Sequence, residues 1–123
     1  MSPPFISPED YALVKPYIIL PMILTAFERD KKIIEGSGAI KTPAPYAAMI
    51  EAAMKRVSTD LRNVKREFRE RGIKVYEVGR RGNLIEAKFV CRGYTGKFNL
   101  RDTYLIVQAG EMMRAYLSGN VVE

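Results

Sequence analysis

The chain has 123 residues, of which 47% are hydrophobic and 28% are charged, and its formal net charge is +6. This length and composition fit one domain with one core, and they exclude a disordered or collagen-like chain. With Cys91 as the only cysteine, no internal disulfide can form, and no secretory signal pattern is visible. We therefore expect a single domain over residues 1–123 and a cytoplasmic location.

The positive charge is concentrated in the middle of the chain. Residues 41–100 hold fourteen basic and six acidic residues, a balance of +8, whereas residues 1–40 and residues 101–123 each sum to −1. Such asymmetry favours an anionic partner over general solubility. A solvated basic face is the alternative explanation.

Two helices are predicted before the basic segment. The stretch SPED at 7–10 supplies a capping serine, a proline suited to the first helical position, and two acids. We expect this helix to end near Lys15, before Pro16, and a second helix to run from Pro21 to Gly36. The apolar run 16–27 is shorter than the roughly twenty residues that a spanning helix needs, so no membrane span is expected.

A third, long helix is predicted over about residues 45–71. Its apolar residues alternate between spacings of three and four, which is a heptad pattern. They are Ala47, Ile50, Met54, Val57, Leu61, Val64 and Phe68. This seam fits either a core face within the chain or the contact between two copies, so a homodimer is one expected arrangement.

A small sheet and a last helix follow. Strands are predicted over 73–78, 84–93 and 97–100, with GRRGN as the first turn, and a helix over 102–118. The fold class is therefore α+β: N-terminal helices including the long heptad-patterned one, then a three-stranded antiparallel meander and a C-terminal helix.

The composition gives catalysis little to work with. No histidine is present, which removes the usual general base and, with one cysteine, any conventional zinc site. Asp60 and Glu67 lie beside basic residues, as surface ion pairs do. Cys91 falls on the apolar side of its strand and is better explained as a small buried hydrophobe than as a reactive thiolate. We expect a non-enzymatic protein without catalytic residues, metal or cofactor.

Binding of nucleic acid is the predicted function. Eight basic residues are the candidates: Lys55, Arg62, Arg66 and Arg69 on the outer face of the long helix, Arg80 and Arg81 at the hairpin tip, and Arg92 and Lys97 around the second turn. If they converge, they form one phosphate-binding footprint. The order of three helices and a basic hairpin resembles the winged-helix architecture, and this resemblance favours DNA over RNA.

Two alternatives remain open at this stage. The basic residues could meet an acidic protein partner, and the apolar helices could mediate homo-oligomeric assembly. Arg80 and Arg81 could also serve only to protect the edge of the sheet from pairing with other strands.

Overall fold

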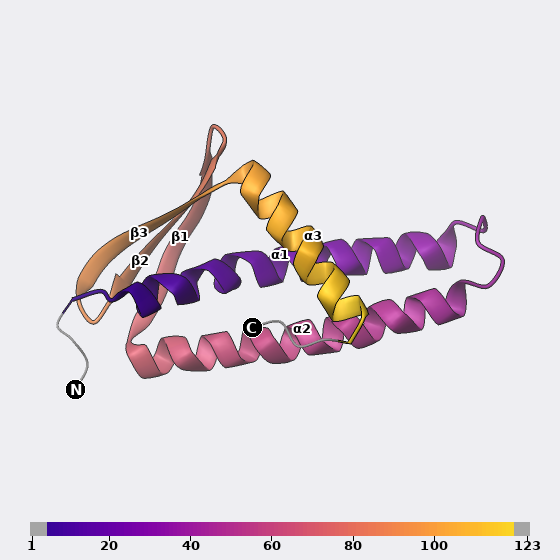
Figure 1. Ribbon diagram of the computed structural model, residues 1–123, viewed down its shortest axis with the longest axis horizontal. Coiled ribbons are helices and arrows are strands. Elements are labelled where there is room, and N and C mark those ends of the chain that lie inside the picture. The colour runs from indigo at the N-terminus through magenta and orange to yellow at the C-terminus, as the bar shows by residue number, and fades with distance from the viewer. Residues whose placement is uncertain (1–4, 120–123) are drawn as a thin grey trace.

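The computed structural model describes residues 5–119 and has the predicted α+β architecture. Two long helices lie side by side and antiparallel, a three-stranded sheet lies at one end of this pair, and a shorter helix crosses over both (Figure 1). The elements in chain order are α1 (Pro8–Gly36), α2 (Pro43–Arg71), β1 (Ile73–Arg81), β2 (Leu84–Cys91), β3 (Tyr94–Arg101) and α3 (Asp102–Leu117).

α1 is one continuous helix, so the predicted break before Pro16 is wrong. The Ser7 hydroxyl accepts from the Asp10 backbone N–H, and the Asp10 carboxylate accepts from the Ser7 N–H, which is a capping box. Pro16 and Pro21 each cost one backbone hydrogen bond inside the helix. The buried apolar residues that flank them pack mainly on α2, and this burial offsets the loss.

The number of helices before the sheet is consequently two rather than three. The winged-helix resemblance fails for this reason, because that architecture needs three short helices. The hairpin that would have been a wing belongs here to a sheet that packs on the start of α1 and the end of α2.

The heptad seam of α2 lies in the core of the chain itself. Ala47, Ile50, Val57 and Phe68 are buried, and Met54, Leu61 and Val64 are partly buried against them. The helix ends at Gly72, whose φ of +69° is the left-handed conformation typical of a helix C-terminus. The seam is therefore a core face within the chain.

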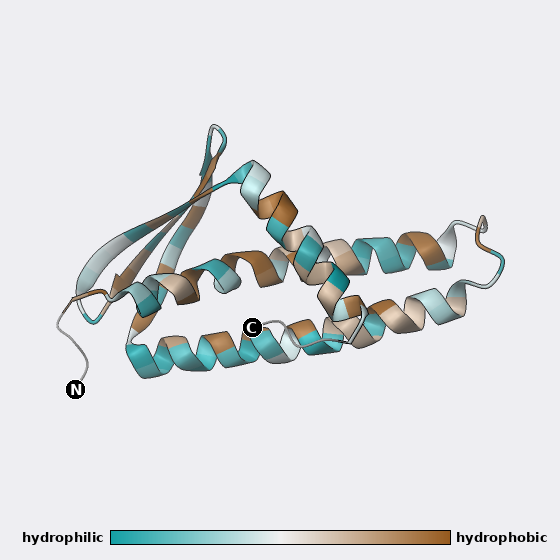
Figure 2. Ribbon diagram, in the orientation of Figure 1, coloured by the Kyte–Doolittle hydropathy of each residue, from teal (hydrophilic) through white to brown (hydrophobic). Residues whose placement is uncertain are grey.

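Two buried clusters meet along α1. The first lies between the three helices and includes Phe27, Leu105 and Tyr116. The second lies between the start of α1, the end of α2 and the inner face of the sheet, and it includes Phe68 and Phe89. Hydrophobic residues recur along both long helices, whereas the C-terminal half of α2 is mostly hydrophilic (Figure 2).

The sheet is antiparallel with the strand order β1-β2-β3, as predicted. β1 is longer than predicted, because Arg81 still pairs with Leu84 and only Gly82 and Asn83 form the tip. Arg80 and Arg81 are therefore strand residues whose side chains alternate between the two faces. This corrects the expectation that both arginines project together from a turn.

α1 is long and apolar enough, by length and composition, to cross a membrane. In its most apolar 18-residue stretch, 39% of the residues are buried inside the protein. The buried apolar residues pack on α2, on α3 and on the inner face of the sheet. Core helices have the same composition, so the absence of a membrane span stays a prediction from the sequence.

Candidate nucleic-acid interface

Arg92 lies in the turn between β2 and β3, where the chain itself occupies its guanidinium. Its Nη2 donates to Oδ2 of Asp10 at 2.7 Å and to the Phe5 carbonyl oxygen at 2.9 Å, and its Nη1 donates to the Arg71 carbonyl oxygen at 2.7 Å. The Asp10 side chain is 1% exposed. Arg92 therefore ties the start of α1 to the end of α2 and has little capacity for a phosphate.

Asp10 is the centre of this network. Arg71 also donates to it, at 3.2 Å, as does the backbone of Ser7 at 2.9 Å. Burial by itself would raise the pKa of Asp10, but the hydrogen bonds from Arg92, Ser7 and Arg71 outweigh burial and hold that pKa well below its usual range. Cys91 lies nearby as a fully buried residue, and burial raises the pKa of its thiol, which confirms it as a small core hydrophobe.

The two arginines of the hairpin have different surroundings. Arg80 faces the helical side of the sheet, where its Nη1 lies 2.9 Å from Oδ2 of Asp102 at the start of α3. Arg81 faces the opposite side and makes no ion pair with any described residue. Of the two, Arg81 is the arginine without a counter-charge among the described residues.

The strand register gathers cations on the outer face of the sheet, which we define as the face opposite the buried Ala87, Phe89 and Cys91. This outer face carries five basic side chains and two acids, a net charge of +3. They are Lys74, Arg81, Lys88, Lys97 and Arg101, against Glu77 and Glu86. Because α1, α2 and α3 all pack away from it, the face is open to solvent.

Lys88 and Lys97 are directly opposite each other on this outer face. Like charges in that position repel, and the 3.0 Å ion pair between Lys88 and Glu77 relieves only one of them. The hydrogen bond to Glu77 is also the main reason that the pKa of Lys88 is raised. Tyr76, 55% exposed, is the chain neighbour of Glu77 and lies at the β-bulge between Val75 and Glu77.

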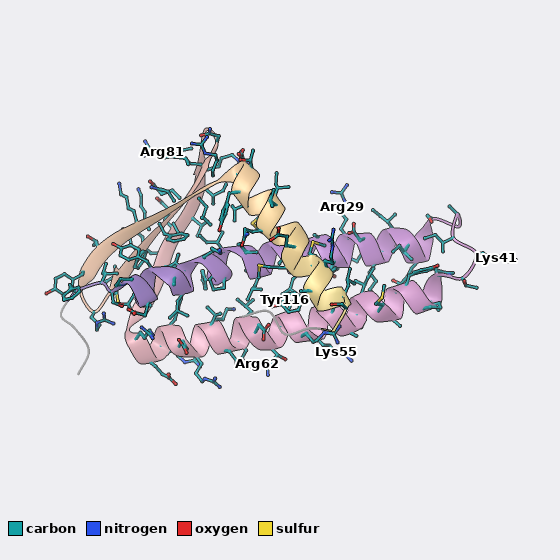
Figure 3. The ribbon with its side chains drawn as sticks, viewed as in Figure 1. Arg29, Lys41, Lys55, Arg62, Arg81 and Tyr116 are labelled. Carbon is teal, nitrogen blue, oxygen red and sulfur yellow. The ribbon has the colours of Figure 1, made fainter. Side chains whose placement is uncertain are left out.

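The basic residues of α2 form a second, separate surface. Lys55, Arg62, Arg66 and Arg69 are all exposed and make no ion pair among residues 5–119. Arg62 lies on the side of α2 that faces away from α1, whereas Arg81 lies at the far end of the hairpin (Figure 3). The eight predicted residues therefore do not share one surface.

The arrangement of α1, α2, the sheet and α3 can be compared with known proteins. The family model described as YhjD protein matches residues 5–121 of this chain. The chain belongs to the YhjD family. A relative named uncharacterized protein YhjD, from Bacillus subtilis (strain 168), is 32% identical over 114 residues, which cover 93% of this chain and 94% of the relative. No solved structure matches the chain.

The YhjD-family match spans every described helix and strand, so the residues of both basic surfaces lie within the matched range. The predicted site residues did not include Lys74, Tyr76, Lys88 or Arg101. Strict alternation along β3 would have indicated Arg101, since it is an even number of positions from Lys97. Among residues 5–119, no three histidine, cysteine or acidic side chains lie close enough to hold a metal ion.

Proposed function

We propose that this protein binds nucleic acid, with single strands preferred, through the outer face of the sheet. The observation that carries the proposal is a cluster of four cations on that open face: Lys74, Arg81, Lys97 and Arg101. None of the four has an acidic partner within the described part of the chain. When such cations neutralise the phosphates of a nucleic acid, the counterions condensed on that nucleic acid are released, and this release drives binding.

Tyr76 supplies the second element that such a surface needs. An exposed aromatic ring beside cations lets a base stack while the backbone tracks the charge, and stacking contributes about 1–3 kcal/mol per base. A rigid groove contact by paired arginines has less support, because Arg80 is engaged with Asp102. This favours an extended single strand over a duplex, with DNA as the first probe.

The basic surface of α2 has a simpler explanation. Arg69 lies in the last turn of the helix, where the negative end of the helix dipole favours a cation. Glu67 and Glu70 interrupt the stripe, and Arg71 pairs with Glu67 at 3.6 Å. The outer face of the sheet also contains two acids, Glu77 and Glu86, but it differs from the α2 surface in having an exposed aromatic residue, Tyr76, on the same strand as two of its cations.

The test is a salt titration of binding to labelled single-stranded DNA, duplex DNA and RNA of equal length. Two variants that each remove two cations are compared with the parent: Arg81→Ala with Lys97→Ala on the sheet, and Arg62→Ala with Arg66→Ala on α2. For single-stranded DNA, we expect the sheet variant to lower the magnitude of the slope of log affinity against log salt by about 1.4, the contribution of two phosphate contacts. The α2 variant should leave the slope near that of the parent, although its net charge equals that of the sheet variant.

Equal losses in both variants would contradict the assignment to the sheet, and absence of binding at low salt would contradict the function itself. Polyglutamate serves as a competitor in the same assay. If it displaces the DNA as effectively as unlabelled DNA does, the partner is an acidic protein instead.

Assembly through α3 is the second candidate function. Ile106 and Val107 are 69% and 58% exposed on this helix, an unusual exposure for two adjacent large apolar residues. With the α2 seam used in the core, this exposed pair on α3 offers a surface on which a second copy can dock. Light scattering of the parent and of Ile106→Glu tests this: a dimer that becomes a monomer supports it, and a monomeric parent rules it out.

A further inference from the structure

A cavity of about 480 Å³ lies where α1, α2 and α3 meet, and none of the eight predicted basic residues lines it. Its polar groups come from all three helices: Lys15 on α1, Asp60 and Asn63 on α2, and Gln108 and Tyr116 on α3. Apolar side chains form much of the remaining wall. This volume and this mixture are typical of small-molecule sites in proteins.

The cation of the cavity has only neutral partners. Lys15 Nζ donates to the Tyr104 hydroxyl at 3.0 Å and to Oε1 of Gln108 at 3.2 Å. It also lies 5.2 Å from the centre of the Tyr104 ring. No acid pairs with Lys15 in the described part of the chain. Because an ammonium has three donors, one remains for a ligand.

The anion of the cavity is also without a charged partner. Asp60 Oδ2 accepts from the Tyr116 hydroxyl at 2.6 Å, and within residues 5–119 no basic side chain forms an ion pair with Asp60. Tyr116 is 1% exposed. Burial, and then the hydrogen bond to Asp60, raise the pKa of the Tyr116 phenol, so Tyr116 stays protonated and orients the carboxylate. The surface ion pairing expected for Asp60 from the sequence is therefore wrong.

Neutral polar groups stand beside each charge. Asn63 makes no side-chain hydrogen bond among the described residues, and Gln108 keeps its amide N–H₂ free because only its oxygen is engaged. The cavity thus holds amide donors beside its two charges.

We propose that this cavity binds a small zwitterion, an α-amino acid with an apolar side chain. The ligand carboxylate pairs with Lys15 and accepts from the Gln108 amide, and the ligand ammonium pairs with Asp60. The apolar side chain of the ligand lies against Leu20 and Met112, which line the same cavity. This inference does not depend on the proposed nucleic-acid function.

A ligand of a single charge fits the cavity less well. Such a ligand would pair with one charge, either Lys15 or Asp60, and would displace water from the other charge without giving it a new partner. A desolvated charge without a partner is costly in free energy. Lys15 and Asp60 do not pair with each other, so the chain leaves both charges for an external partner. A zwitterion is the smallest molecule that pairs with both.

The experiment measures binding by backbone amide chemical shifts and by calorimetry. The probes are L-leucine, leucinamide, which lacks the carboxylate, and 4-methylpentanoate, which lacks the ammonium. Each is used up to about 10 mM, above the millimolar dissociation constant of a weak complex. We expect leucine to bind most tightly, with shifts centred on the residues of the cavity.

Two variants separate the roles of the charges. Lys15→Met should lower leucine affinity by about tenfold or more and abolish its advantage over leucinamide. Asp60→Asn should likewise lower the affinity for leucine and abolish the advantage of leucine over 4-methylpentanoate. The amide oxygen of the new asparagine can still accept the hydrogen bond from Tyr116. Lys65→Met and Glu111→Gln make the same chemical changes at exposed positions outside the cavity and should have no effect.

Met112→Trp fills the cavity without changing charge and should abolish binding. It also keeps the test decisive if Asp60→Asn fails to fold, which circular dichroism would reveal. The proposal is overturned if leucine causes no shifts in the parent, if the three probes bind equally, or if leucine still binds the Met112→Trp protein unchanged.

Discussion

The two turns of the sheet are alike in sequence but opposite in surroundings. Each places arginine next to glycine, as GRRGN and CRGYTG. At the β2–β3 turn, Arg92 meets Asp10, a buried acid 82 positions away in the chain. At the β1–β2 end, Arg80 pairs with Asp102 of α3, whereas the strand residue Arg81 points to the open face and meets no acid of the described chain. A basic residue near a turn is therefore a binding candidate only where no distant element supplies its counter-charge.

Removing the acids at the two ends of the sheet gives the largest expected contrast. Asp10→Ala should lower the free energy of unfolding by about 3 kcal/mol or more, because it leaves charged groups of Arg92 and Arg71 without their buried partner. Asp102→Ala, which breaks the exposed pair with Arg80, should cost about 1 kcal/mol or less. Urea unfolding measures both, and equal costs would contradict the distinction.

The two ends also differ in how tightly their glycines are packed. A Cβ at Gly96 would lie 2.7 Å from Phe89 Cζ and 2.9 Å from Ile6 Cδ1. Gly96→Ala should therefore destabilise by about 1–3 kcal/mol through overpacking. At the other end, nothing lies within 4 Å of a Cβ at Gly79, so Gly79→Ala should change stability by no more than about 0.5 kcal/mol. Thermal unfolding compares the pair, and a tolerated Gly96→Ala would show that this end is loosely packed.

Acid should weaken the β2–β3 end selectively. The pKa of Asp10 is lower in the folded protein than in the unfolded chain, so its contribution is present above the ordinary aspartate pKa of about 4 and is lost as the pH falls below it. The effect should be smaller than that of Asp10→Ala, because a protonated carboxyl still forms hydrogen bonds. Unfolding titrations from pH 7 downward, in the parent and in Asp10→Asn, check this. If Asp10→Asn loses stability as steeply as the parent when the pH falls, acids other than Asp10 cause the acid sensitivity.

The smallest expected effect concerns binding rather than stability. Tyr76→Ala should weaken binding of single-stranded DNA by about 1 kcal/mol, roughly fivefold, through the loss of one stacked base. Tyr94→Ala is the matched control, because Tyr94 is similarly exposed but follows the Arg92 turn. Fluorescence anisotropy at fixed salt measures both. If Tyr94→Ala lowers the affinity for single-stranded DNA as much as Tyr76→Ala does, Tyr76 has no specific role in the proposed interface.

Local patterns were sufficient for much of the fold. The spacing of Ala47 to Phe68 predicted α2 and its buried face, and Cys91 was correctly placed on the apolar side of its strand. Both patterns work because burial on one side of a helix or strand imposes its own period on the sequence. The capping serine likewise marked the start of α1.

The candidate sites were less accessible to such reasoning. Arg62, Arg81 and Lys97 were found as exposed cations, but their division between two surfaces depends on how the sheet is oriented on the helices. The cavity was not found at all. Lys15, Asp60 and Gln108 lie on three different helices, and no spacing in the sequence relates them.

By itself, the sequence determined which segments form helices and strands and which side of each is buried, since these follow from contacts between near neighbours in the chain. Tertiary structure decided that α1 continues through Pro16 and Pro21, because packing on α2 offsets two lost hydrogen bonds. It also decided which charges are already paired, as Arg92 is by Asp10, and which stay open. A charge takes its partner from whatever lies within a few ångströms of it, and only the folded chain sets that distance.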